Sequence, residues 1–298
     1  MPGDLKIGAV FPTSEIGDDP VVIRDFVQAV EGLGFDALVT YDHVLGAPHE
    51  GRTPRLTGPY TEEHAFHEPF VLFGYLAAVT RKIRLVTGVI VLPQRQTALV
   101  AKQAAEVALL SGDRLVLGVG VGWNHVEYEA LGVPFERRGV RLGRQVELLR
   151  KLWREPIVEH RDELHVIDRA GLNPRPRRDI PIWFGSIAPR SLARAARLGD
   201  GVLFPMAGKM AQPLNEQLDA ALAAAGRAGV PFARGEIVDV SLGRDALVAE
   251  AELWRAAGGT ELVVSTLARA TPGSLVPASG RDVDRHLAEL RAAAAALL

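Results

Sequence analysis

Two adjacent residues, Asp42 and His43, are the first in the chain whose types suggest acid–base chemistry. They directly follow the apolar run Phe35–Tyr41, which predicts a short buried strand. Histidine titrates near neutral pH, so His43 can donate a proton or polarise a carbonyl, while Asp42 fixes its tautomer or serves as a base. A structural interpretation is equally open, in which Asp42 caps a turn and His43 packs under the segment that follows.

A second candidate is the glycine-rich turn after the predicted strand Leu115–Val119. A backbone without Cβ atoms at every second position can lie flat against a planar or phosphorylated ligand. The alternative is a strand that uses glycine where its neighbours crowd. The spacing G-x-G-x-G differs from the G-x-G-x-x-G fingerprint of dinucleotide-binding proteins, and no clear acidic residue follows about 20 positions on. The turn comprises Gly118, Gly120, Gly122, Trp123 and Asn124.

A third candidate joins the predicted strand Pro181–Gly185 to the predicted helix Pro189–Leu198. A glycine, a hydroxyl group, free backbone N–H groups and an arginine counter-charge at the start of a helix are typical of a phosphate cradle. An ordinary N-cap would explain the serine but not the combination. The residues are Gly185, Ser186, Ile187 and Arg190.

The remaining polar clusters are weaker candidates for a functional site. His64 and His67 lie among glutamates, but no H-E-x-x-H pattern is present and a solvated polar loop is favoured, so no metal site is expected. The sequence contains neither the Gly-x-Ser-x-Gly elbow of serine hydrolases nor a P-loop pattern.

Short apolar runs alternating with helical segments must position these candidates. Eight such strands predict a (β/α)₈ TIM barrel of the α/β class, forming a single domain over residues 1–298, with a doubly wound sheet as the alternative. The active face of such a barrel lies at the C-terminal ends of its strands, where all three candidates fall. The expected strands are Leu5–Phe11, Phe35–Tyr41, Ile83–Leu92, Leu115–Val119, Pro181–Gly185, Gly201–Phe204, Gly235–Val240 and Glu261–Ser265.

Three segments depart from the regular alternation. Leu45–His67 follows the second strand, lacks periodicity and is too long for an ordinary connection, so we expect an insertion that acts as a lid. The polar segment Ile157–Asp179 is compatible with a small hairpin outside the barrel. The Pro/Gly/Ser-rich segment Thr271–Gly280 predicts a loop, and an extra C-terminal helix is expected from Asp282.

Composition limits the possible partners. The 298 residues are 48% hydrophobic, with a net charge of −2 and scattered arginines, which argues against nucleic acid and favours a small-molecule substrate. The absence of cysteine excludes disulfides and thiolate chemistry. Neither a secretory leader nor an apolar stretch long enough to span a membrane is present, so a cytoplasmic protein without membrane attachment is expected.

Three segments resemble one known family when they are taken together. Thr40–Val44 ("TYDHV"), Thr87–Val133 and Pro181–Phe204 ("PIWFGSIAPRSLARAARLGDGVLF") are similar to the bacterial-luciferase-like superfamily, the luciferase-like monooxygenases, and especially to its coenzyme F420-dependent oxidoreductase branch. The resemblance runs from Lys6 to about Phe204. It implies a (β/α)₈ barrel, commonly a homodimer, that holds FMN or coenzyme F420 at its mouth with the substrate above the ring.

The resemblance also implies roles for individual residues. Asp42 and His43 match the family's active-site pair. Val89 and Ile90 match a bulged third strand that often contains a non-proline cis peptide, which we expect at Val89–Ile90 or Gly88–Val89. The remaining cofactor contacts are expected along the ring and ribityl chain (Gly120, Gly122, Trp123, Asn124) and at the phosphate (Gly185, Ser186, Ile187, with Arg190 as counter-charge).

The preferred function is F420-dependent hydride transfer between the deazaflavin and an unidentified small organic substrate. Trp123 stands where the family's glucose-6-phosphate dehydrogenases have a glutamate, which leaves His43 as the candidate for proton transfer. An FMN-dependent monooxygenase on the same fold is the main alternative. A flavin-binding protein without turnover, and an aldolase or isomerase that uses Lys209, remain as further alternatives.

Overall fold

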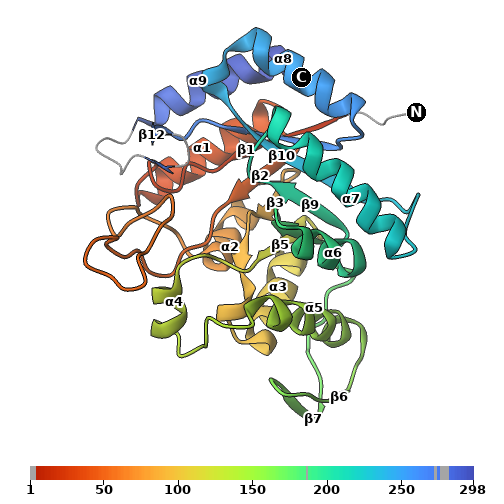
Figure 1. The fold of residues 1–298 in the computed structure, drawn as a ribbon. Coiled ribbons are helices and arrows are strands. Elements are labelled where there is room, and N and C mark those ends of the chain that lie inside the picture. Colours follow the sequence, from red (N-terminus) through yellow and green to blue (C-terminus); the bar gives the residue numbers. More distant parts are fainter. Residues whose placement is uncertain (1–4, 186, 272–273, 276–281) are drawn as a thin grey trace.

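Short, mostly apolar strands form the centre of the fold. In the computed structural model, which describes residues 5–185, 187–271, 274–275 and 282–298, these strands lie parallel in one sheet with helices around it (Figure 1). Strand β3 pairs with β5 and closes the sheet into a barrel. The bounds are β1 Lys6–Val10, β2 Ala37–Thr40, β3 Arg84–Thr87, β4 Ile90–Val91, β5 Leu115–Gly120, β8 Ile182–Gly185, β9 Gly201–Phe204, β10 Ala233–Asp239 and β11 Glu261–Ser265.

The predicted barrel is confirmed, and each of the eight expected strands is present. The third strand is divided into β3 and β4, both of which pair with β5. Side chains alternate between the two faces of each strand, so one apolar cluster fills the interior and another lies between the strands and the helices. The interior cluster includes Val39, Val86, Val116, Leu203 and Val263.

The helices follow the strands in the order expected from the apolar periodicity. Asp19 accepts hydrogen bonds from the backbone N–H groups that begin α1, and Gly112 ends α3 in the left-handed conformation. The bounds are α1 Pro20–Gly32, α2 Pro69–Val79, α3 Thr97–Ser111, α4 His125–Ala130, α5 Arg138–Arg154, α6 Pro189–Leu198, α7 Gln212–Ala224, α8 Arg244–Ala256 and α9 Val283–Leu297. Short 3-10 turns are η1 Leu92–Gln94, η2 Gly208–Met210 and η3 Val240–Leu242.

The additions to the barrel also follow the sequence, with one difference. Residues 45–67 contain no helix or strand and form the predicted insertion, and β6 (Val158–Arg161) pairs antiparallel with β7 (Val166–Ala170) as the outer hairpin. The terminal helix α9 packs beside α1 and α8 (Figure 1). The prediction of a loop from Thr271 to Gly280 was wrong at its start, because β12 (Arg269–Thr271) pairs with β13 (Ser274–Leu275). Among the described helices, none is both long and apolar enough to cross a membrane.

Candidate active site

His43 lies at the barrel mouth and is held by a carboxylate from a distant part of the chain. Its Nδ1 lies 3.2 Å from both carboxylate oxygens of Glu127, in α4. Glu127 is buried, and its Oε1 also accepts the backbone N–H groups of Val44 at 2.6 Å and Leu45 at 3.1 Å. The four contacts fix the Glu127 carboxylate and, through it, the orientation of the imidazole. In the part of the chain that the structure describes, Nε2 of His43 makes no hydrogen bond and remains available to a ligand.

Asp42 points away from His43 and belongs to a separate ion-pair network. Its Oδ1 accepts Nη2 of Arg95 at 2.6 Å, and its Oδ2 accepts the backbone N–H of Val91 at 2.9 Å. Arg95 also contacts Glu68, the N-cap of α2, at 2.9 Å. The hypothesis that Asp42 fixes the tautomer of His43 is therefore wrong, because adjacent residues in an extended segment point in opposite directions and Glu127 takes that place.

Burial and charge act against each other in this network. Burial raises the pKa of Asp42, and the Arg95 guanidinium opposes the rise. Burial alone would lower the pKa of Arg95, but the Asp42 and Glu68 carboxylates outweigh it and raise that pKa. The contact between Asp42 and the protonated Arg95 fixes the segment after β4 against the end of β2.

Aromatic side chains enclose the free side of His43. The ring centroid of His43 lies 4.8 Å from that of Tyr60, 4.9 Å from Phe66 and 5.5 Å from Trp123. Tyr60 and Phe66 belong to the insertion, whereas Trp123 follows β5. Gly58 of the insertion lies flat against Trp123, since a Cβ atom there would be 2.4 Å from the indole. The insertion therefore covers the mouth, as expected of a lid.

A bulge in the third strand forms the floor of the mouth. The peptide between Gly88 and Val89 is cis, which confirms the expectation at one of its two positions. The glycines around this bulge make room for valine side chains. A Cβ atom would lie 2.5 Å from Val89 Cγ2 at Gly120 and 2.9 Å from Val89 Cγ1 at Gly185, and at Gly122 it would lie 2.6 Å from Val91 Cγ1. Val89 and these glycines thus share one closely packed layer.

The surface of that layer is apolar and partly open. Gly88 and Val89 are half-buried, as are Val121, Gly122 and Gly185, although the residues beneath them are buried. The predicted contact residues Ile90 and Asn124 are buried. Ile90 packs in the core, and Asn124 caps α4 through the N–H of Val126 and donates to the carbonyl of Leu45. Asn124 thereby fastens the insertion to the turn after β5.

The predicted phosphate cradle follows β8, the strand that pairs with β5. Gly185 ends β8, Ile187 and Arg190 are exposed, and the N-cap of α6 is Ala188 rather than Ser186. Arg190 makes no ion pair with another described residue, so its guanidinium is accessible to an anion. Ser186 lies outside the described residues.

The sequence interpretation missed several contacts that the fold creates. Glu127 and Arg95 were not singled out, although a glutamate two residues into a helix beside a glycine-rich turn was a usable signal for Glu127. His64 and His67 show no metal geometry. Nδ1 of His64 accepts the N–H of Thr61 at 3.0 Å, and Nε2 of His67 lies 3.0 Å from the carbonyl oxygen of Gly17. They hold the insertion in place.

Comparison with known proteins places the chain in a family. The model of the luciferase-like monooxygenase family matches residues 9–297, so this protein is a member of that family. An uncharacterised protein of Mycobacterium tuberculosis is 37% identical over 192 residues, covering 63% of this chain and 66% of that protein. The 5,10-methylenetetrahydromethanopterin reductase of Archaeoglobus fulgidus is 29% identical over 225 residues, covering 75% and 65%.

A third relative is named for another substrate. The F420-dependent glucose-6-phosphate dehydrogenase of Amycolatopsis mediterranei is 27% identical over 205 residues, covering 67% of this chain and 57% of that enzyme. The matched regions thus span 66%, 65% and 57% of the lengths of these three relatives. The two named relatives are a reductase and a dehydrogenase, and the matching family model is described as luciferase-like monooxygenase.

Solved structures support the same fold. An F420-dependent secondary alcohol dehydrogenase in complex with an F420-acetone adduct superposes with a TM-score of 0.76 at 15% identity, covering 99% of this chain and all of that chain. A monooxygenase from Streptomyces bottropensis superposes with a TM-score of 0.74 at 19% identity, covering 98% of each. These likenesses establish the luciferase-like TIM barrel.

Proposed function

We propose that this protein is a coenzyme F420-dependent oxidoreductase that exchanges a hydride between the deazaflavin and a small organic substrate. The observation that carries the proposal is the pairing of His43 with Glu127 above the apolar floor at Val89. It provides a positioned imidazole on one side of a surface suited to a flat ring. The curated relatives named for F420-dependent chemistry support the choice of cofactor.

The residues at the mouth fit such a cofactor. The floor of Gly88, Val89 and Gly122 presents backbone and aliphatic carbon, against which a planar ring can lie without desolvating charged groups. The exposed Arg190, beside the turn after β8, can pair with a phosphate. When bound there, the deazaflavin would supply hydride exchange. The chain's own residues would position the substrate and handle the proton.

His43 is the residue assigned to the proton. Glu127 accepts from Nδ1, so Nε2, in a ring that lies among Tyr60, Phe66 and Trp123, is the nitrogen left for a substrate oxygen. A hydrogen bond at that oxygen would stabilise the charge that develops as the carbon gains or loses hydride. The insertion would exclude water once Tyr60 and Phe66 have closed over the substrate.

A cofactor-binding titration tests the proposal without a known substrate. Purified protein is titrated with oxidised F420 and separately with FMN, and binding is followed by absorbance and fluorescence. We expect saturable binding of F420 and much weaker binding of FMN. Tight binding of FMN without affinity for F420 would instead establish the alternative, a flavin-dependent monooxygenase, which the 29% identical pyrimidine monooxygenase of Allorhizobium ampelinum keeps open.

Substitutions at the mouth separate proton handling from cofactor binding. His43→Asn and Glu127→Gln are expected to lower hydride-transfer turnover roughly 100-fold or more, because general acid–base groups contribute factors of this size. Both variants should bind F420 nearly as tightly as the wild type. Equal turnover by all three proteins would show that His43 and Glu127 do not handle the proton. Binding of F420 by the wild type without turnover, with propan-2-ol and acetone among the compounds screened, would leave the alternative of a flavin-binding protein.

We also propose that the protein acts as a homodimer. Helix α2 reads "PFVLFGYLAAV", without a charged residue on any face, although Val71 is 73% exposed and Tyr75 is 37% exposed. An apolar surface helix of this kind favours a protein partner. Light scattering should give twice the mass of the chain, and Val71→Glu with Tyr75→Glu should shift it toward the mass of one.

A further inference from the structure

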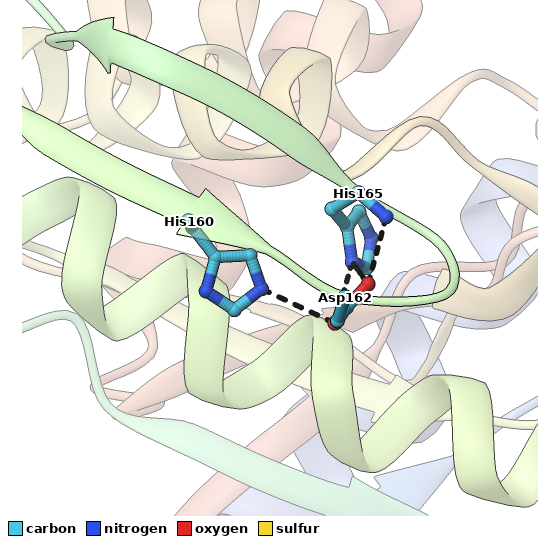
Figure 2. Close-up of side chains that lie close together, drawn as sticks. All are labelled: His160, Asp162 and His165. Atoms are coloured by element: carbon cyan, nitrogen blue, oxygen red, sulfur yellow. Dashed lines mark hydrogen bonds and ion pairs between the residues drawn. The ribbon is translucent and has the colours of Figure 1, made fainter.

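The outer hairpin brings together two histidines and an aspartate that take no part in the proposed function. Figure 2 shows His160 at the end of β6, Asp162 in the turn and His165 before β7, with their polar atoms converging. Nε2 of His160 lies 3.1 Å from Oδ2 of Asp162, and Nδ1 of His165 lies 3.1 Å from Oδ1 and 3.2 Å from Oδ2. One ligand atom from each residue lies within 4.8 Å of the other two.

The central carboxylate is held in one orientation. Oδ1 of Asp162 accepts the backbone N–H groups of Leu164 and His165, each at 2.7 Å. Burial opposes ionisation, but these hydrogen bonds and those from both imidazoles outweigh it and hold the pKa of Asp162 well below its usual range. The backbone hydrogen bonds therefore hold the Asp162 carboxylate with an oxygen near each imidazole.

His165 is fixed from the other side of its ring. Its Nε2 lies 2.7 Å from Oγ1 of Thr97, a buried residue at the start of α3, and the same oxygen accepts Nε2 of Gln145 at 3.1 Å. A polar partner on the far nitrogen is the arrangement that orients histidines which bind metals through their other nitrogen. The body of the protein thus determines where Nδ1 of His165 points.

The cluster is also accessible to solvent. The side chains of His160, Asp162 and His165 are 27%, 19% and 13% exposed, so an ion can reach them without unfolding the hairpin. Glu163, which lies in the same turn, points outward and pairs with Arg144 at 3.0 Å. That pair anchors the turn to α5 but contributes no ligand.

The distances match those between the ligands of a small tetrahedral cation. With metal–ligand bonds of about 2.0–2.2 Å, neighbouring ligands of zinc are roughly 3.3 Å apart. His160 Nε2 and His165 Nδ1 lie 3.1 and 3.2 Å from the same oxygen, Oδ2 of Asp162, which is close to this value. Two imidazoles and one carboxylate suit zinc, and with three protein ligands the fourth position is left for water.

We propose that His160, Asp162 and His165 form a zinc-binding site on the outer hairpin. Zn²⁺ would bind Nε2 of His160, Nδ1 of His165 and one carboxylate oxygen of Asp162. Each imidazole binds as the neutral tautomer with its proton on the other ring nitrogen, so a proton leaves the coordinating nitrogen for solvent and another is taken up at the far nitrogen, with no change in oxidation state. Binding cross-links β6, the turn and β7, so its effect is to stabilise the hairpin against α3 and α5.

Metal titration of the whole protein tests this site. Metal-free protein is titrated with Co²⁺, whose visible absorption reports tetrahedral coordination, and with Zn²⁺ by calorimetry. We expect one site per chain, an increase in Tm with Zn²⁺, and at least a 10-fold loss of affinity in His160→Ala. His160 is the most exposed ligand of the three, so its removal is the least disruptive to folding.

Two control variants keep the result specific. Glu163→Gln changes the same turn without removing a ligand, and His43→Ala removes the mouth histidine that could bind metal instead, so both should retain zinc binding and the Tm increase. Thr97→Val is expected to weaken binding about 10-fold through the orientation of His165. Absence of cobalt absorption, or equal zinc affinity in wild type and His160→Ala, would overturn the proposal.

Discussion

Asp42 and Glu236 both have buried carboxyl groups, but the two carboxyl groups have different neighbours on the two sides of the barrel. Asp42, after β2, meets the Arg95 guanidinium at 2.6 Å and a backbone N–H at 2.9 Å. Glu236, in β10, forms no ion pair with a cationic side chain among the described residues. Burial, reinforced by the neighbouring Glu250 carboxylate, raises the pKa of Glu236 to about 9. One side of the barrel therefore places a cation beside its buried carboxyl group, while the other leaves its carboxyl group to retain a proton.

The difference coincides with the position of the candidate site. Glu127, on the same side as Asp42, is also provided with partners, namely His43 and two backbone N–H groups. Fixed charges with satisfied hydrogen bonds hold a site in one geometry. The neutral carboxyl group of Glu236 instead faces the Glu250 carboxylate, between β10 and α8. The side of the barrel with β2, β4 and β5 is built for positioning charge at the mouth.

Removing Asp42 should have the largest effect on stability. Asp42→Ala leaves Arg95 buried beside a single, partly exposed partner, and we expect the free energy of unfolding to fall by about 3–5 kcal/mol. Urea denaturation measures this change. The control is Glu68→Gln on the same arginine, which should cost less than about 1 kcal/mol because Glu68 is 35% exposed. Equal losses in the two variants would remove the distinction between a buried and a peripheral partner.

Glu236→Gln should increase the free energy of unfolding, opposite to the effect of Asp42→Ala. From about pH 4.5 to 9 the folded protein keeps a proton on Glu236 that the unfolded chain has lost, so stability falls as pH rises through this window. The variant lacks this linkage and should be more stable by roughly 2–4 kcal/mol near pH 7.5. Thermal unfolding between pH 5 and pH 9 should show a Tm that falls more steeply with rising pH in the wild type than in Glu236→Gln. Parallel curves for the two proteins would show that Glu236 is ionised in the fold.

Glycine substitutions should have the smallest effects on stability. Made on each side of the barrel, they allow the packing of the two sides to be compared. Gly120→Ala would place a Cβ atom 2.5 Å from Val89, whereas Gly235→Ala in β10 would meet Leu203 at 3.0 Å, where a side chain can shift. We expect a cost of about 1–3 kcal/mol for Gly120→Ala and less for Gly235→Ala. Chemical denaturation should also show that part of the lost free energy of unfolding is recovered when Gly120→Ala is combined with Val89→Ala. No recovery would mean that Val89 is not the obstructing group.

The elements of the barrel could be predicted because their signals are local. Buried parallel strands appear as short apolar runs, such as "LVLGVG" in β5 and "ELVVS" in β11, and helix ends appear as caps such as Asp19. The bulge near Val89 followed from the family resemblance, and the cis peptide was found at one of the expected positions. The position of His43 at the mouth could also be predicted from the sequence, because the C-terminal ends of the strands share one face of a barrel.

The partners of these side chains were decided only by the tertiary structure. Glu127 lies 84 positions from His43 in the chain, and Asp42 turns away from its neighbour toward Arg95. Gly120 at the end of β5 and Gly122 in the turn after it proved to accommodate Val89 and Val91, side chains from the divided third strand. His160, Asp162 and His165 are close in sequence, yet the direction of their side chains depends on the turn and on Thr97 in α3. The periodic pattern of buried residues can be recognised in the local sequence, whereas a contact between side chains depends on how separate elements pack together in space.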